Sequence, residues 1–228
     1  MQSKNKVLIL LVIFYTIACN PDDMNSKTYK YLALGDSYTI GESVDVNKRY
    51  PVQLIDSLNK AGINIDNYKI VAKTGWTTDE LLLGIDTAIT LEKYDLVTLL
   101  IGVNNQYRGR DLNNYREEFT QLLHKAIEYA KNDPYKVVVI SIPDWGVTPF
   151  AKERNIELIA KEIDDFNAVN KEESIKAGVY YVNVTNISRQ AAKQPELIAF
   201  DGLHPSGIMY SMWVNEIMPF AEKILARK

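Results

Sequence analysis

The chain has 228 residues, 46% apolar and 24% charged, which is ordinary for a globular protein and fits one large domain or two small ones. The formal net charge of −3 leaves no basic surplus, so the composition argues against a nucleic-acid partner. One cysteine excludes an internal disulfide and a cysteine-rich zinc site. Two histidines, with no His-Glu-x-x-His pattern, argue against a histidine-rich metal site.

The N-terminal segment has the pattern of an export signal. Lys4 and Lys6 precede an apolar run at positions 7–17. A membrane-spanning helix needs about 20 apolar residues, so this run is too short for a normal transmembrane segment and fits the apolar core of a secretory signal.

The end of that run, Thr16-Ile17-Ala18-Cys19, resembles a bacterial lipobox, whose cysteine is acylated and becomes the new N-terminus. Thr16 departs from the usual Leu. The resemblance implies a signal peptide at 1–18, a lipid-anchored tether at 19–27 and a domain at 28–228. It also implies an exported protein of the bacterial cell envelope, and Asn20 after the cysteine favours the outer membrane. The alternative is an ordinary secretory signal cut nearby, with Cys19 a bystander.

Five short apolar runs predict strands in the rest of the chain. The third and fourth are nearly continuous in Val, Leu and Ile, as expected for strands buried on both faces. In chain order the predicted strands are 29–34, 68–72, 96–101, 137–142 and 180–184.

Helical patterns lie between and after these strands. The first covers 51–61, with Pro51 near its start and Gly62 as its stop. A capping box at 77–80 begins the second. The other three are a long helix with an apolar face at 112, 115, 119, 122, 123 and 126, a helix from about 156 that ends near Gly178, and a final helix from about Ser206 with a possible break near Pro219.

Strand and helix alternate five times, which requires right-handed crossovers and a parallel sheet covered on both faces. The prediction is therefore one three-layer α/β/α domain around a five-stranded parallel sheet. Ligands of such sheets bind beyond the carboxyl ends of the strands, where strand order reverses. The segments predicted at that edge are 35–41, 73–76, 102–105 and 201–205.

These segments contain the residues of a nucleophilic site. Ser37 on a tight turn after a strand can expose its hydroxyl, and a serine hydroxyl needs an adjacent base, which His204 can supply. Asp201, three residues earlier, can hold the other ring nitrogen. The backbone N–H groups of Ser37 and Gly75 and the side-chain amide of Asn104 can converge on one developing oxyanion.

The ordered segments resemble the SGNH hydrolases, also called the GDSL esterase/lipase family, which have a flavodoxin-like fold. The resemblance implies Ser37 as nucleophile, His204 as base, Asp201 as the third triad member, and Ser37, Gly75 and Asn104 as the oxyanion hole. It implies a serine esterase without metal or cofactor, acting on carbohydrate acetyl esters or small lipid and acyl esters. The alternative is a catalytically inactive glycan- or lipid-binding lipoprotein of the same fold.

This sequence departs from the family pattern at three places. Asn105 stands where the third block usually has Asp, which predicts an altered local hydrogen bond without loss of activity. Tyr38 follows the nucleophile where Leu is frequent. The second block is reduced to Gly75 after a strand.

Each assignment has a structural alternative. Ser37 can be a helix cap, His204 a buried structural histidine, Asn104 the cap of a turn and Gly75 a simple turn glycine. Asp36 is equally well explained as a hydrogen-bond partner of nearby loops.

Further side chains follow the same strand ends. They either line a substrate cleft or pack the loops: Tyr38, Trp76, Gln106, Tyr107 and Trp145. Arg108 and Arg110 fit surface positions better than recognition of an anionic substrate group. His124 lies off the apolar stripe of its helix, which predicts a solvated side chain with no catalytic role.

Overall fold

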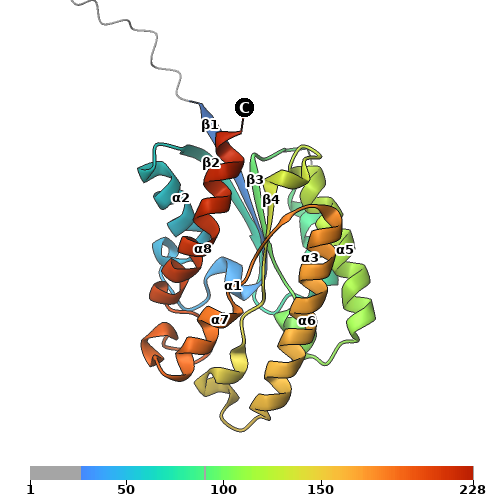
Figure 1. Ribbon diagram of the computed structural model, residues 1–228, viewed down its shortest axis with the longest axis vertical. Coiled ribbons are helices and arrows are strands. Elements are labelled where there is room, and N and C mark those ends of the chain that lie inside the picture. The colour runs from blue at the N-terminus through green and yellow to red at the C-terminus, as the bar shows by residue number, and fades with distance from the viewer. Residues whose placement is uncertain (1–26, 90, 228) are drawn as a thin grey trace, which may run out of the picture.

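The computed structural model describes residues 27–89 and 91–227. They form one five-stranded parallel sheet in the order β2-β1-β3-β4-β5 (Figure 1), which confirms the predicted architecture. The predicted signal peptide and Cys19 lie outside the described residues. The strands are β1 (Thr28–Gly35), β2 (Asn64–Ala72), β3 (Leu96–Leu100), β4 (Val137–Ile140) and β5 (Tyr180–Val182).

Helices cover both faces of the sheet (Figure 1). Helices α2 and α8 pack together on one face, and α3, α5 and α6 lie on the other. No helix within the described ranges is long and apolar enough to cross a membrane. The helices are α1 (Ser37–Ile40), α2 (Tyr50–Lys60), α3 (Thr78–Ala88), α4 (Val103–Tyr107), α5 (Leu112–Tyr129), α6 (Ile156–Ala177), α7 (Thr185–Ser188) and α8 (Gly207–Ala226).

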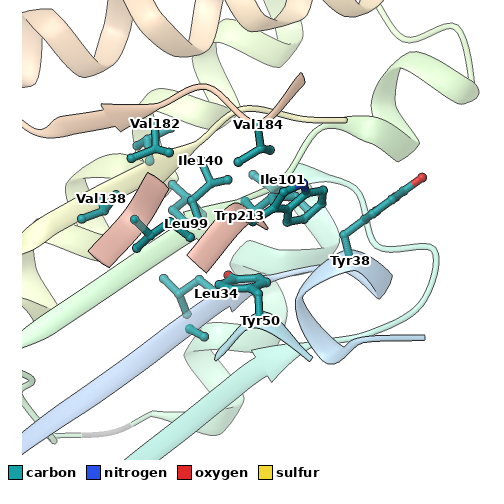
Figure 2. Packing of buried hydrophobic residues seen from close by; sticks show 14 of the residues in the cluster. Leu34, Tyr38, Tyr50, Leu99, Ile101, Val138, Ile140, Val182, Val184 and Trp213 are labelled. Atoms are coloured by element: carbon teal, nitrogen blue, oxygen red, sulfur yellow. The ribbon is translucent and has the colours of Figure 1, made fainter. Parts of the chain in front are cut away.

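The core lies between the central strands and the helices. Every residue of β3 and β4 is buried, as the continuous apolar runs predict. Leu34 of β1 pairs with Leu99 of β3, and both belong to the apolar cluster that contains Trp213 of α8 (Figure 2). Tyr38 lies at the end of this cluster, beyond Trp213, so the first turn after β1 is anchored to the core through its side chain.

The strand order determines where on the sheet a ligand is expected to bind. The chain leaves β1 for β2 on one side and returns to β3 on the other, so the carboxyl ends of β1 and β3 flank the point where the winding reverses. Ligands of such sheets bind there. Because α1 follows β1 directly and α4 follows β3, Ser37 as the first residue of α1 and Asn104 as the second residue of α4 both lie at this point.

Three helix ends agree with the sequence signals. Thr77 and Glu80 form the capping box of α3, Gly178 ends α6 at a φ of 73°, and Ser206 caps α8. The suggested break near Pro219 does not occur, because α8 continues to Ala226. Proline removes one helical hydrogen bond, but buried apolar residues on both sides of it hold the helix against the sheet.

Some strands begin or end at other residues than predicted, because hydrogen bonds to neighbouring segments determine their ends. Strand β2 starts at Asn64, because its polar first half pairs with β1 at the sheet edge. Strands β4 and β5 end early, at Ile140 and Val182. Just beyond them the Ser141 hydroxyl accepts hydrogen bonds from the Val184 and Thr185 N–H groups, which replaces the ladder.

Candidate active site

A small cavity of about 140 Å³ opens at the carboxyl edge of the sheet. Two predicted triad residues, Ser37 and His204, line it, and so does Asn104. These residues come from three separate segments of the chain, so the fold brings together what the strand-end motifs predict. The remaining lining residues are Tyr38, Val103, Tyr107, Trp145, Phe150 and Leu203.

The turn that carries Ser37 is set by its neighbours. A Cβ on Gly35 would lie 2.1 Å from Thr39 Oγ1 and 2.4 Å from the Leu100 carbonyl oxygen, so only glycine fits there. The Asp36 carboxylate caps α1 by accepting a hydrogen bond from the Tyr38 N–H at 3.0 Å. Ser37 is thereby fixed as the first residue of α1, and only 4% of its surface is exposed.

Asp36 is fully buried beside the nucleophile. Burial raises the pKa of its carboxyl from 3.8 to about 7, although hydrogen bonds from the Tyr38 N–H, its own N–H and Asn104 oppose the rise. The side chain therefore both caps α1 and contacts a predicted oxyanion residue, which supports the interpretation of Asp36 as a partner of nearby loops.

The segment before α8 holds the predicted base and acid in one tight turn. His204 Nδ1 lies 2.6 Å from Asp201 Oδ2. The other carboxylate oxygen accepts the Leu203 and His204 N–H groups, each at 3.0 Å. Gly202 between them has a φ of 73°, a conformation that favours glycine. The two side chains are thus joined as a triad requires.

Charge in this turn is stabilised by donors. Burial raises the pKa of Asp201, but the hydrogen bonds from His204, the Leu203 N–H and Ser43 outweigh it and lower the pKa to about 2. The carboxylate is therefore ionised across the neutral range and faces the histidine ring.

His204 is held from both sides. Its ring packs on Tyr38 with a centroid distance of 5.1 Å, and its carbonyl accepts the Ala199 N–H at 2.8 Å. Within the described residues no hydrogen bond joins His204 to Ser37. Such bonds are commonly long in a free enzyme and tighten when substrate binds.

Asn104 and Gly75 differ in how they relate to the cavity. The Asn104 amide donates to the Trp76 carbonyl at 3.0 Å and to Asp36 Oδ2 at 3.4 Å, which fixes its orientation beside Ser37. Gly75 has a φ of 84° and is not part of the cavity lining; its carbonyl accepts a hydrogen bond from Arg108 at 2.6 Å.

The structure divides the predicted cleft residues. Tyr38, Tyr107 and Trp145 line the cavity, whereas Trp76 and Gln106 do not. Trp76 packs against Gly84 of α3, where a Cβ would lie 2.2 Å from its ring. Gln106 is buried and supports the wall from behind, since it accepts the Trp145 indole N–H at 2.7 Å and donates to Glu162 at 2.7 Å.

Phe150 is a lining residue that the sequence did not identify. It lies in the short 3₁₀ helix Pro149–Ala151, in the long connection between β4 and α6, away from any strand-end motif. Its ring packs on Trp145 and Tyr107 at centroid distances of 5.9 and 6.2 Å. The only available signal was a second aromatic residue five positions after Trp145.

Two arginines near Asn104 form ion pairs with carboxylates of the protein and do not line the cavity. Arg108 lies 3.4 Å from Glu80, and Arg110 lies 2.8 Å from Asp79, in agreement with surface roles. His124 is exposed on α5, as predicted.

Asn105, at the departure from the family pattern, is fully buried. It accepts the Thr78 N–H at 3.1 Å and donates to the Thr78 hydroxyl at 2.6 Å. It therefore joins α4 to the start of α3, which is a structural contact outside the cavity. No group of three or more His, Cys, Asp or Glu side chains in residues 27–89 and 91–227 is arranged to hold a metal ion.

Comparisons with known proteins agree with this geometry. An arylesterase of Vibrio mimicus is 24% identical over 200 residues, which cover 87% of this chain and 88% of that protein. The family 3 carbohydrate esterase of Clostridium thermocellum superposes with a TM-score of 0.68 at 24% identity, over 87% of this chain and 98% of that chain. A lipase/acylhydrolase of Enterococcus faecalis gives 0.67 at 21% identity, over 83% and 93%.

The family assignment comes from the sequence model of the GDSL-like lipase/acylhydrolases, which matches residues 33–211. That span starts within β1, ahead of the turn that carries Ser37, and ends within α8, after His204. It therefore includes the end of β1, the other four strands and every segment of the cavity. The chain therefore belongs to the GDSL-like lipase/acylhydrolase family, whose members hydrolyse ester bonds.

Proposed function

We propose that the protein is a serine esterase in which Ser37, His204 and Asp201 form the catalytic triad. The observation that carries the proposal is that Ser37 and His204 line one cavity while His204 is hydrogen-bonded to Asp201. Ser37 attacks the ester carbonyl and gives its proton to His204, which then protonates the departing alcohol. Water, deprotonated by His204, attacks the acyl-enzyme and releases the acid.

The oxyanion formed in each step needs preorganised donors. We assign the Ser37 N–H, the Gly75 N–H and the Asn104 side-chain amide to this role. Asn104 supports the assignment best, since it lines the cavity and its amide is oriented by the Trp76 carbonyl at 3.0 Å. Its second N–H, which makes the longer bond of 3.4 Å to Asp36 Oδ2, is the one assigned to the oxyanion. The support for Gly75 is its position in the loop that follows β2, since it does not line the cavity. One such donor typically contributes about 2.7–4 kcal/mol to lowering the barrier.

The size of the cavity favours a short acyl group. At about 140 Å³ it is smaller than the roughly 300–1,000 Å³ of pockets that enclose drug-sized ligands. The aromatic rings of Tyr107, Trp145 and Phe150 close it on one side. We therefore propose acetyl and other short acyl esters as substrates, with the alcohol part outside the cavity. Relatives described as an arylesterase and a carbohydrate esterase fit an aromatic or sugar alcohol.

The triad is tested by single substitutions assayed with p-nitrophenyl acetate. Ser37→Ala and His204→Ala should each lower kcat by roughly 10⁶-fold, and Asp201→Asn by roughly 10⁴-fold. Urea unfolding of each variant shows whether the fold is intact. Undiminished turnover by a folded Ser37→Ala variant would refute the mechanism. A wild-type protein that hydrolyses no ester and whose Ser37 is not labelled by a serine-reactive phosphonate would instead be the inactive binding form.

We also propose that the esterase is anchored to the cell envelope through lipid on Cys19, after removal of residues 1–18. The support is the short apolar run at 7–17, the small residue before Cys19 and the start of the folded domain at β1. Cys19→Ser should move the protein from the membrane fraction to the soluble fraction. An N-terminal peptide whose Cys19 carries no lipid mass in the wild type would contradict this.

A further inference from the structure

The loop after α1 contains a serine that contacts the proposed triad. The Ser43 hydroxyl donates a hydrogen bond to Asp201 Oδ2 at 2.7 Å. This is the same oxygen that faces His204 Nδ1 at 2.6 Å, while Oδ1 accepts two backbone N–H groups. Among residues 27–89 and 91–227 the carboxylate thus has four donors, of which Ser43 alone lies outside the 201–204 turn.

Ser43 holds a conformation that is uncommon for serine. Its φ is 63°, in the left-handed region, where a residue other than glycine is unfavourable. The loop is fixed on both sides of it. The Glu42 N–H donates to the Ser37 carbonyl at 3.0 Å and the Glu42 carboxylate accepts the Thr74 hydroxyl, while the Val44 N–H donates to the Gly41 carbonyl at 3.4 Å. The surrounding contacts therefore hold the serine where its hydroxyl reaches Asp201.

We propose that Ser43 is a positioning residue of the esterase, which fixes the Asp201 carboxylate so that it holds the His204 ring in its reactive orientation. The inference rests on the triad proposed above. Ser43 does not line the cavity and so acts through Asp201 and not on substrate. Without it, the histidine is the one donor to Oδ2 among the described residues, and the carboxylate is held only by groups of its own turn.

Substitution by glycine distinguishes a role of Ser43 in the shape of the loop from a role of its hydroxyl in holding Asp201. Glycine adopts a positive φ readily, so Ser43→Gly relieves the backbone and removes only the hydroxyl. Ser43→Ala removes the same hydroxyl and keeps the unfavourable backbone. If the residue served only the shape of the loop, the glycine variant would be at least as active as the wild type.

The expected result is a loss in kcat without a loss in binding. With p-nitrophenyl acetate, Ser43→Gly and Ser43→Ala should each lower kcat about 10–100-fold, the size expected for a hydrogen bond to a charged group, with KM within about twofold. Ser211→Ala, at an exposed serine of α8, serves as the matched control and should leave kcat unchanged. A Ser43→Gly variant with wild-type kcat would overturn the inference.

A double-substitution cycle shows whether the effect passes through Asp201. In an Asp201→Asn background, Ser43→Gly should change kcat less than twofold, because the carboxylate that it positions is already absent. An undiminished effect in that background would overturn the inference. Failure of the triad itself gives a different result, namely an active Ser37→Ala variant or an inactive wild type.

Discussion

Replacing Phe150 with alanine should widen the acyl cavity and shift the enzyme toward longer acyl esters. The Phe150 ring closes the cavity against Trp145 and Tyr107, and 45% of the residue's surface is exposed, so its loss removes a wall and not part of the core. The backbone of the segment stays in place, because the Phe150 N–H donates to the Gly202 carbonyl at 3.0 Å, a bond that alanine keeps.

The size of the shift follows from the area that a longer acyl chain can bury. Each methylene removed from water contributes about 0.8 kcal/mol, which is about fourfold in a rate ratio. Butyryl has two more methylenes than acetyl, so the Phe150→Ala variant gains about 1.6 kcal/mol for it. The ratio of kcat/KM for butyrate over acetate should therefore rise about 15-fold relative to the wild type.

The assay compares p-nitrophenyl acetate with p-nitrophenyl butyrate for the wild type and each variant. Tyr135→Ala is the matched control: Tyr135 is 49% exposed and stands before β4, at the opposite end of the sheet from the cavity. Its ratio should stay at the wild-type value. A Phe150→Ala ratio within twofold of the wild-type ratio would refute the proposal that Phe150 limits the length of the acyl chain. An equal shift of the ratio in Tyr135→Ala would refute it too.

Two further substitutions test the surroundings of the site. Because the pKa of Asp36 is about 7 when folded and 3.8 ordinarily, the folded state keeps a proton that the unfolded chain loses, and the unfolding free energy falls as pH rises between these values. Asp36→Asn should remove a fall of about 2–3 kcal/mol between pH 5 and pH 8, measured by urea unfolding; an unchanged fall contradicts the assignment. Gly84→Ala places a methyl group 2.2 Å from the Trp76 ring and should lower the unfolding free energy by about 1–3 kcal/mol, with a shift in tryptophan fluorescence; unaltered fluorescence and stability would contradict the packing.

The fold was predictable because its signals are local. Strands β3 and β4 are buried on both faces, so their apolar runs are continuous, and the α3 capping box is complete within four residues. The continuity of α8 at Pro219 was not predictable. It depends on packing of this helix against the sheet, and the local sequence around Pro219 does not contain that information.

The same distinction holds within the site. Ser37, Asn104 and His204 lie next to a strand end or a helix start, so the alternating pattern alone brings them to one edge. Phe150 and Ser43 reach that edge only through the path of a loop, and their partners are far away in the sequence. Neither residue belongs to a strand-end motif, and so neither could be predicted.

The side chains of the aromatic wall and those of the triad are held by separate contacts, and the bond from the Phe150 N–H to the Gly202 carbonyl joins the two only through backbone. Trp145 is fixed by Gln106 through its indole N–H and by the neighbouring Asp144, which caps the Trp145 turn and pairs with Arg189 at 2.9 Å. Asp201 and His204 are fixed by bonds within their own turn and by the bond from the Ser43 hydroxyl to Asp201. A change of side chain in the wall therefore alters the volume of the cavity without moving the reacting groups. Acyl preference and catalytic rate are for this reason expected to change independently, as Phe150→Ala and Ser43→Gly would show when assayed together.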